Sequence, residues 1–355
     1  MTRSTATSDL AARWAELRAE EPRIRIRDAA ERLGVSELAL LLTRQGGVTP
    51  IRLDFEAFIT RAEELGEVMA LTRNAHCVIE TDGTYREPTF GSHSTSIVQP
   101  GVDLRIFQSR WAHLVAVETG AGDETRRSFQ AFDAHGDAVH KIWLRDGSDV
   151  DAFRSIVAEF AEGAETPELE PHAEESSRDA EESPDPEPDV DRDPEPDVEG
   201  LLRAWSKLEH THDFFRLMPR FSVTRTQALE LAEGRFTRRL DTGVVKTLLE
   251  TASEREIDIM IFVGNPGCIQ IHTGRVDRVV ETGDWVNVMD PGFNLHLVRT
   301  DVAHAWAVTK PTSYGEIRSV EVYAEDGTQI ASFFGLRKEG TQVAEGWEEL
   351  VEELD

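Results

Sequence analysis

The chain has 355 residues, of which 39% are hydrophobic and 30% charged, a globular balance and a length suited to two domains. Its formal net charge of −29 argues against a nucleic-acid partner, because such partners are bound by clustered Lys and Arg. Only Cys77 and Cys268 are cysteines, too few for a disulfide framework or a four-cysteine zinc site. Neither a bilayer-spanning apolar run nor a secretory signal core is found, so we expect a cytoplasmic protein without membrane insertion.

Helical and strand-like segments alternate along the chain. Apolar residues at three- and four-residue spacing predict helices over residues 26–42, 55–66, 150–160, 244–257 and 344–354. Alternating or β-branched runs predict strands over residues 102–107, 113–118, 294–298 and 304–309. Two further strand-like runs within residues 320–334 meet at the turn Asp326-Gly327. The pattern predicts an α+β fold, with an antiparallel sheet flanked by helices.

Residues 163–199 differ in composition from both halves of the chain. They contain the hexamer DPEPDV twice and almost nothing apolar. Residues 161–200 hold 17 Asp and Glu against two Arg, so this stretch alone carries −15. Such segments cannot bury enough apolar surface to fold, and their like charges keep them extended. We therefore expect a disordered acidic linker between domains at residues 1–162 and 200–355.

The two halves repeat each other at one constant offset of 191 residues. The offset aligns Met69 with Met260, Cys77 with Cys268, Leu104 with Leu295, His113 with His304 and Gly136 with Gly327. The halves are therefore interpreted as two copies of one domain. The paired cysteines fall at equivalent sheet positions, which favours a packing role over redox chemistry.

Several long segments carry a resemblance to a known family. In the C-terminal half they are MIFVGNPGCIQIHTG (260–274), WVNVMDPGFNLHL (285–297) and ASFFGLR (331–337). In the N-terminal half they are PRIRIRDAAERLGVSE (22–37), GEVMALTRN (66–74) and RRSFQAFDAHGDAVHK (126–141). With these segments the chain resembles the HemS/HmuS/ChuS family of bacterial haem-utilisation proteins. The resemblance implies two tandem homologous domains, each a broad antiparallel sheet with helices on one side, and one haem b in a cleft between the halves.

The resemblance also implies an axial ligand for the haem iron. The family histidine lies in a segment similar to EHTHDFFRLMPRF (209–221), where His212 is the match. A neutral imidazole is a standard ligand of haem iron, and the following Phe214 and Phe215 offer apolar walls to a porphyrin. His210 is the alternative ligand. Without the resemblance, a lone helical histidine would be read as an ordinary surface or core residue.

The two haem propionates need cationic partners. The resemblance implies Arg225, Lys310 and Arg337 in this role, while the alternative for each is an ordinary surface cation. From the N-terminal half it implies Arg105 and Phe107, which alternate onto one sheet face and cover the other side of the haem. The alternative for this pair is an exposed Arg beside a core Phe.

The sequence departs from the family near its C-terminus. The family often presents a glutamine and a tyrosine in a segment similar to ASFFGLR, and here Ser332 and Phe334 hold those places. The hydrogen bonds of those family residues are then lost or reduced, which bears on any transfer of enzyme activity. His272 and His296 lie in common family segments, and we interpret them as structural histidines.

Two main functions follow from the resemblance, and no catalytic residue is assigned. The first is a haem carrier that receives haem from an importer and passes it to a separate haem oxygenase. The alternative is an enzyme that opens the porphyrin ring; without a flavin or nicotinamide motif, its electrons would come from a reductase or a small molecule. A third option, a haem-responsive regulator, is disfavoured by the lack of a basic recognition helix. No Walker loop, GxSxG elbow or HExxH helix is present.

Overall fold

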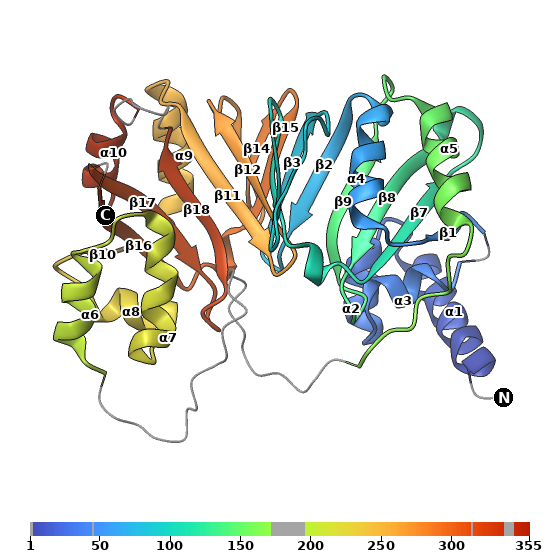
Figure 1. The fold of residues 1–355 in the computed structure, drawn as a ribbon, viewed down its shortest axis with the longest axis horizontal. Coiled ribbons are helices and arrows are strands. Elements are labelled where there is room, and N and C mark those ends of the chain that lie inside the picture. The colour runs from blue at the N-terminus through green and yellow to red at the C-terminus, as the bar shows by residue number, and fades with distance from the viewer. Residues whose placement is uncertain (1–2, 45, 172–195, 314, 337–343) are drawn as a thin grey trace. The chain divides into compact units, whose positions relative to one another are not determined.

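The computed structural model describes residues 3–44, 46–171, 196–313, 315–336 and 344–355. The chain forms two compact units (Figure 1). Unit 1 comprises residues 1–72, 80–176 and 266–270, and unit 2 comprises residues 73–79, 177–265 and 271–355. Each unit therefore includes a short segment from the opposite half of the sequence, and these two segments overlap under the 191-residue offset, which maps residues 73–79 onto 264–270.

Unit 1 combines helices with antiparallel strands. Its helices are α1 (Arg3–Glu20), α2 (Ile26–Leu33), α3 (Glu37–Leu41), α4 (Phe55–Ala62) and α5 (Val150–Ala161), with 3-10 turns η1 (Glu63–Leu65), η2 (Gln108–Arg110) and η3 (Gly122–Glu124). Its strands are β1 (Val48–Ile51), β2 (Val68–Arg73), β4 (Thr89–Phe90), β5 (Thr95–Gln99), β6 (Val102–Ile106), β7 (His113–Thr119), β8 (Arg126–Phe132) and β9 (Ala138–Leu144). Strands β3 (Cys77–Gly83) and β12 (Cys268–Gly274) contribute residues to both units.

The main sheet of unit 1 has helices on both faces. Its strands follow the order β1-β7-β8-β9-β2, and β4, β5 and β6 pair separately. Because side chains alternate along a strand, Leu114 and Ala116 belong to the core beneath α4 and α5, whereas Val115 and Val117 belong to the core beneath α3. The expectation of helices on one side only was therefore wrong, because both faces of this sheet are apolar and both need cover.

Unit 2 has the same plan. Its helices are α6 (Val198–Trp205), α7 (Leu217–Phe221), α8 (Arg225–Leu231), α9 (Val244–Glu254) and α10 (Trp347–Glu353), with 3-10 segments η4 (Thr211–Arg216) and η5 (Arg299–Asp301). Its strands are β10 (Thr237–Leu240), β11 (Ile259–Asn265), β13 (Val279–Thr282), β14 (Trp285–Asp290), β15 (Phe293–Val298), β16 (His304–Thr312), β17 (Gly315–Tyr323) and β18 (Gln329–Gly335). The expected α+β fold, with two homologous repeats and large antiparallel sheets, is confirmed.

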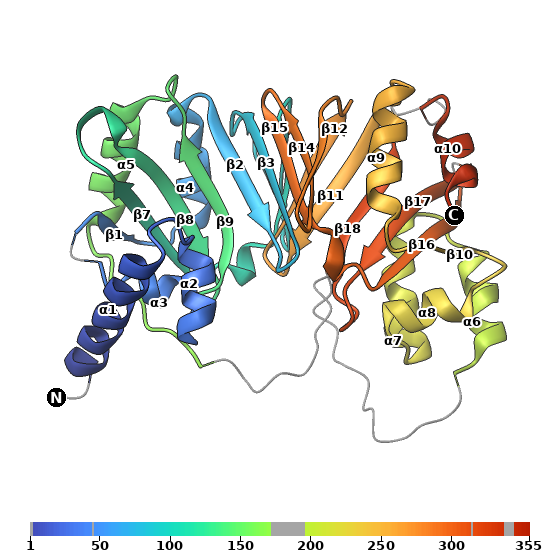
Figure 2. The ribbon, with the colours of Figure 1, turned by 180° about the vertical axis from the view of Figure 1, so that it is seen from behind.

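The two faces of the unit 2 sheet, in the order β10-β16-β17-β18-β11, also have separate cores. On one face, Val320 and Val322 pack with α9 and α10, and Figure 2 shows α9 lying across β11 and β18. On the other face, Trp306 and Tyr323 pack with α6, η4, α7 and α8, which lie beside β10 and β16 in Figure 1. The second face also carries the segment with His212, the candidate iron ligand.

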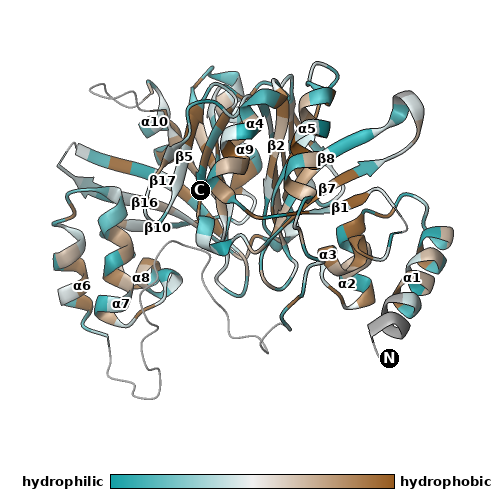
Figure 3. Cartoon of the chain, turned by 45° about the vertical axis from the view of Figure 1, so that its right-hand side comes forward, coloured by the Kyte–Doolittle hydropathy of each residue, from teal (hydrophilic) through white to brown (hydrophobic). Residues whose placement is uncertain are grey.

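Helix ends follow local sequence signals. The side chain of Asp197 accepts a hydrogen bond from the Gly200 amide at 2.8 Å and begins α6, and Thr224 begins α8 in a capping box with Gln227. Helix α2 ends at Gly34, whose φ of 67° suits a residue without a Cβ. Helices such as α6 carry hydrophobic and hydrophilic residues on different faces (Figure 3), so packing against the sheet stabilises them.

Part of the acidic segment contacts unit 1. Leu169 packs against the core formed by α3 and β7, and the Glu170 amide donates to the Ala134 carbonyl at 2.9 Å. Residues 172–195 of the expected linker lie outside the described residues, and its last residues, from Asp197, already cap and begin α6. Among the described residues, no helix is long and apolar enough to cross a membrane.

Candidate functional site

The candidate ligand lies on a short 3-10 helix. His212 is exposed at the surface of η4, and among the described residues no hydrogen bond or ion pair involves its imidazole. His210 is also exposed and precedes η4, where its amide donates to Asp213 Oδ2 at 3.0 Å. The two histidines flank the first residue of the helix, and His212 presents its imidazole to solvent.

A buried ionic cluster lies on the same face of the sheet. Its centre is Glu321 of β17, which is fully buried. Glu321 accepts hydrogen bonds from Arg225 Nη2 at 2.8 Å, from Lys310 Nζ at 2.9 Å, from the Ser319 hydroxyl at 2.9 Å and from the Tyr323 hydroxyl at 2.6 Å. Arg225 Nε also donates to the Tyr323 hydroxyl at 2.6 Å. Arg225 and Lys310 are only 6% and 3% exposed, which rules out the alternative that they are ordinary surface cations.

The cluster has a formal net charge of +1, counting Arg225 and Lys310 as cations and Glu321 as an anion. Burial alone would raise the pKa of Glu321, but the charges of Arg225 and Lys310 outweigh burial and hold that pKa well below its usual range. Burial lowers the pKa of Lys310, while Glu321 opposes this effect. Burial also raises the pKa of Tyr323 well above its usual value, so the phenol stays protonated. Two cations therefore share one carboxylate away from water.

Aromatic rings of η4 cover these cations. Lys310 Nζ lies 4.6 Å from the ring centroid of Phe214, and Arg225 Cζ lies 5.1 Å from the ring centroid of Phe215. The Phe214 ring is fully buried and contacts Trp205 of α6, with 4.5 Å between the ring centroids. Phe214 and Phe215, predicted as apolar walls, thus contact Lys310 and Arg225, which were predicted as propionate partners.

Ser332 and Phe334 belong to the same sheet face. The strand register pairs Ser332 with Glu321, and Phe334 with Ser319. The Gln329 amide donates to the Ser332 hydroxyl at 2.8 Å and to the Tyr323 hydroxyl at 3.3 Å. A glutamine and a tyrosine therefore lie beside Ser332, although motif positions alone predicted that such groups were lost or reduced.

The remaining candidates lie elsewhere. In unit 1, Arg105 of β6 is half-buried and donates to the Ser96 hydroxyl at 3.1 Å. Strand β6 ends at Ile106. Phe107 therefore lies just beyond the end of the strand, and its side chain is buried. The alternation that was expected to bring Arg105 and Phe107 onto one strand face stops there. Arg337 lies outside the described residues.

The histidines read as structural do have partners. His296 Nδ1 lies 2.7 Å from Asn287 Oδ1, and His272 Nε2 lies 3.0 Å from the Arg275 carbonyl oxygen. The His272 ring also stacks on Phe293 at a centroid distance of 3.5 Å. These contacts agree with a structural role. Both cysteines are fully buried, and burial raises their thiol pKa values, that of Cys268 to about 12.

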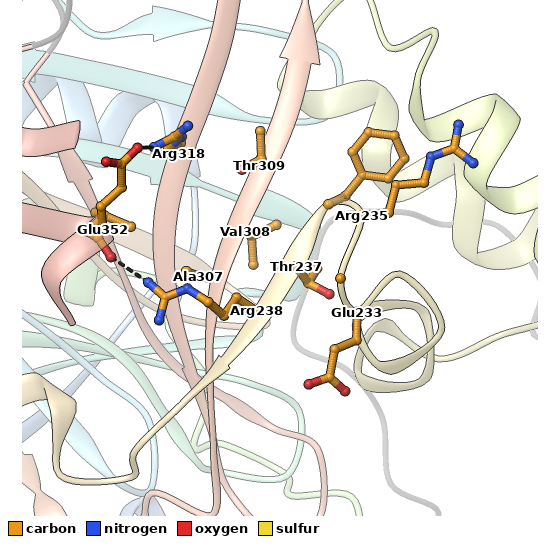
Figure 4. Close-up of a pocket in the computed structure, with 12 residues that line it drawn as sticks. Glu233, Arg235, Thr237, Arg238, Ala307, Val308, Thr309, Arg318 and Glu352 are labelled. Atoms are coloured by element: carbon orange, nitrogen blue, oxygen red, sulfur yellow. Dashed lines mark hydrogen bonds and ion pairs between the residues drawn. The ribbon is translucent and has the colours of Figure 1, made fainter. Parts of the chain in front are cut away.

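A separate hollow of about 440 Å³ in unit 2 contains none of the candidate residues. It lies along β10 and β16 next to α10 (Figure 4). Figure 4 shows Arg318 bonded to Glu352, while Arg238 donates to the Val351 and Leu354 carbonyls at the end of α10. Its arginines at 238 and 318 therefore have partners within the fold, and we assign no ligand to this hollow.

Comparisons with known proteins agree with the repeat and with its sequence motifs. A family profile described as "Haemin-degrading HemS.ChuX domain" matches residues 34–160 and again residues 222–354. The chain is 33% identical over 353 residues to "Hemin transport protein HmuS" of Yersinia pestis, with 96% of each chain covered. The chain belongs to the HemS/HmuS/ChuS family.

Solved structures of family members have the same fold. The chain is similar to holo-PhuS, described as a heme-binding protein from Pseudomonas aeruginosa, with 40% identity and a TM-score of 0.90, covering 98% of this chain and 99% of that one. It is also similar to ChuS, described as an E. coli heme oxygenase, with 30% identity, a TM-score of 0.84 and the same coverage. The family thus includes proteins described as binding haem and proteins described as degrading it.

The sequence analysis did not identify Glu321, Tyr323 and Gln329 as residues of the candidate site. One signal was available, since Glu321 interrupts an otherwise apolar run in the strand-like segment VEVYAEDG. A carboxylate at the centre of a predicted buried strand requires a cationic partner. The partners, however, come from 96 residues upstream and 11 residues upstream, so the sequence alone could not identify them.

Proposed function

We propose that the chain binds haem and serves as a haem carrier in haem uptake and iron acquisition. The observation that carries this proposal is the exposed His212 on η4, next to two aromatic rings that rest on a buried cation pair. An imidazole, apolar rings and cations are the groups that haem iron, porphyrin and propionates respectively require. The relatives described as a heme-binding protein and as a hemin transport protein support the same ligand.

Each candidate residue has one role in this proposal. His212 is the iron ligand, with His210 as the alternative. Arg225, Lys310 and Arg337 are the propionate partners. Arg105 and Phe107 cover the second face of the haem. Ser332 and Phe334 lie on the sheet face that the haem approaches.

The hydrogen bonds among the polar side chains around Ser332 favour a haem carrier over a haem-degrading enzyme. Activation of iron-bound oxygen depends on polar donors directed at the ligand. Here Gln329 donates to Ser332 and Tyr323, and the Tyr323 hydroxyl donates to Glu321. These polar groups therefore bond to one another, and the neighbouring Phe334 supplies only an apolar ring. The proposed location is the cytoplasm, with an importer as the donor of haem and a haem oxygenase or reductase as the acceptor.

A spectral titration of wild type and His212→Ala tests the ligand. We expect one haem per chain and a histidine-ligated spectrum that His212→Ala loses, with His210→Ala as the matched control. Identical spectra for wild type and His212→Ala would contradict the assignment. Treating the wild-type complex with ascorbate in the presence of catalase tests the carrier role. A defined open-chain tetrapyrrole formed over several turnovers would instead support the enzyme.

A further inference from the structure

The helix that carries His212 has little stability of its own. It is a 3-10 segment of six residues, longer than most such segments, and its hydrogen-bond geometry is weaker than that of an α-helix. His212 itself is exposed and has no side-chain partner among the described residues. Its position therefore depends on how the neighbouring Phe214 and Phe215 are held. Both rings contact charged groups that belong to α8 and to the sheet.

A short chain of contacts connects these rings to one buried carboxylate. Phe214 lies over the Lys310 ammonium, and Phe215 lies over the Arg225 guanidinium. Both cations donate to Glu321, each to a different carboxylate oxygen. Glu321 thereby fixes the distance between two cations that would otherwise repel each other in a medium of low dielectric constant.

We infer that Glu321 is a positioning residue, which acts through Arg225 and Lys310 on Phe214 and Phe215 and so holds η4 with its histidine in place. The inference rests on the proposed function, in which His212 is the iron ligand. It assigns Glu321 no contact with the haem. A carboxylate would repel the propionates, so an effect of Glu321 on ligation must be transmitted through the cations.

The charge of the cluster explains why the carboxylate is needed. With Glu321 replaced by an uncharged residue, the cluster would hold two buried positive charges and no compensating negative charge. Such an arrangement is resolved by loss of a proton, by movement of a cation to solvent, or by local opening. Each of these removes a cation from beneath an aromatic ring of η4.

The first test concerns the ligand-free protein. Glu321→Gln keeps the shape of the side chain, and Glu352→Gln, which changes an exposed glutamate of the same unit, is the matched control. Hydrogen–deuterium exchange is measured on amides 211–221. We expect exchange there to be faster in Glu321→Gln than in wild type and unchanged in Glu352→Gln. Equal exchange in wild type and Glu321→Gln would overturn the inference.

The second test concerns the haem complex. We expect Glu321→Gln to lose part of the histidine-ligated signal in the absorption and electron paramagnetic resonance spectra. The loss should be the same with haem and with haem dimethyl ester, because it arises from the histidine segment and not from the propionates. A loss seen with haem but absent with the dimethyl ester would overturn the inference in favour of a role in propionate binding.

A milder variant covers the case in which Glu321→Gln does not fold. Tyr323→Phe keeps the ring and removes the hydroxyl that links Arg225 to Glu321. We expect the same changes in exchange and in spectrum at a smaller size, and wild-type behaviour in both would overturn the inference. If His212→Ala leaves the haem spectrum unchanged, the proposed ligand fails, while the exchange of amides 211–221 still decides the role of Glu321.

Discussion

Acidification should destabilise unit 1 through a single buried histidine, His140. The ring is 1% exposed. Its Nδ1 lies 2.8 Å from the Thr72 hydroxyl, its Nε2 bonds to the Tyr85 hydroxyl, and the ring stacks with Trp111. Among the described residues, no carboxylate forms a hydrogen bond or an ion pair with this imidazole. Burial lowers its pKa to about 3. The neutral form is therefore the one that the fold accommodates.

The magnitude follows from the difference between folded and unfolded pKa values. An unfolded histidine has a pKa of about 6.5, so between about pH 6.5 and pH 3 the unfolded chain binds a proton that the folded chain does not. The stability due to neutral His140 is complete above pH 6.5 and is lost as the pH falls. With about 1.4 kcal/mol for each pKa unit, the loss between pH 7 and pH 5 is about 2 kcal/mol.

Urea unfolding at pH 7 and pH 5, read by pulse labelling of thiols, measures this loss unit by unit. Cys268 is buried in unit 1 and Cys77 in unit 2, so one chain reports both units. We expect the Cys268 transition to move to lower urea at pH 5 by more than the Cys77 transition. His140→Gln should remove most of the difference. An equal pH response of Cys268 labelling in wild type and His140→Gln would refute the reasoning.

Two further predictions concern unit 1 and the acidic segment. Glu37 and Lys141 form a buried ion pair in unit 1, and Glu37→Gln should destabilise that unit by about 3–5 kcal/mol because it leaves an uncompensated buried ammonium. The double variant Glu37→Gln/Lys141→Met should recover much of this loss in the same labelling assay. Deleting half of residues 172–195 while keeping Leu169 should leave the Cys268 and Cys77 transitions nearly unchanged, since halving the length of a connecting segment changes its closure entropy by only about 0.6 kcal/mol. A large shift of either transition would show a specific role for this segment.

The repeat, the fold class and most helices could be predicted because they depend on local or periodic signals. The helices predicted at 55–66, 150–160 and 244–257 are observed as α4, α5 and α9 within a few residues. The helix predicted at 26–42 is observed as α2 and α3, and the helices on the second face of the unit 2 sheet were harder to predict. Segments such as η4 and α7 are short and lack a clear period, and packing against the sheet determines them.

The site could be predicted only in part, for a physical reason. His212, Arg225 and Lys310 were found through the resemblance, but their environment depends on contacts between distant residues. A sequence does not show whether a cationic side chain is buried. Arg225 and Lys310 therefore could not be distinguished from ordinary surface cations before their burial was known. The buried carboxylate that pairs with both cations is Glu321, and its cationic partners come from α8 and β16.

The repeats are asymmetric, and the proposed iron ligand belongs to unit 2 together with Arg225 and Lys310. The 191-residue offset aligns Glu321 with Gln130, Tyr323 with Phe132, Lys310 with Thr119 and Arg225 with Gly34, and it aligns His140 with Ala331, Tyr85 with Val276 and Thr72 with Val263. Each unit thus holds a buried polar cluster at positions where the other unit has uncharged or apolar residues. The duplicated scaffold supplies the backbone, and different side chains supply the chemistry. Because the ionic cluster and the exposed histidine segment occur together in unit 2, the shared scaffold alone cannot give unit 1 the same ligand chemistry. A substitution of Glu321 should therefore affect haem ligation differently from a substitution of Gln130, its equivalent in unit 1.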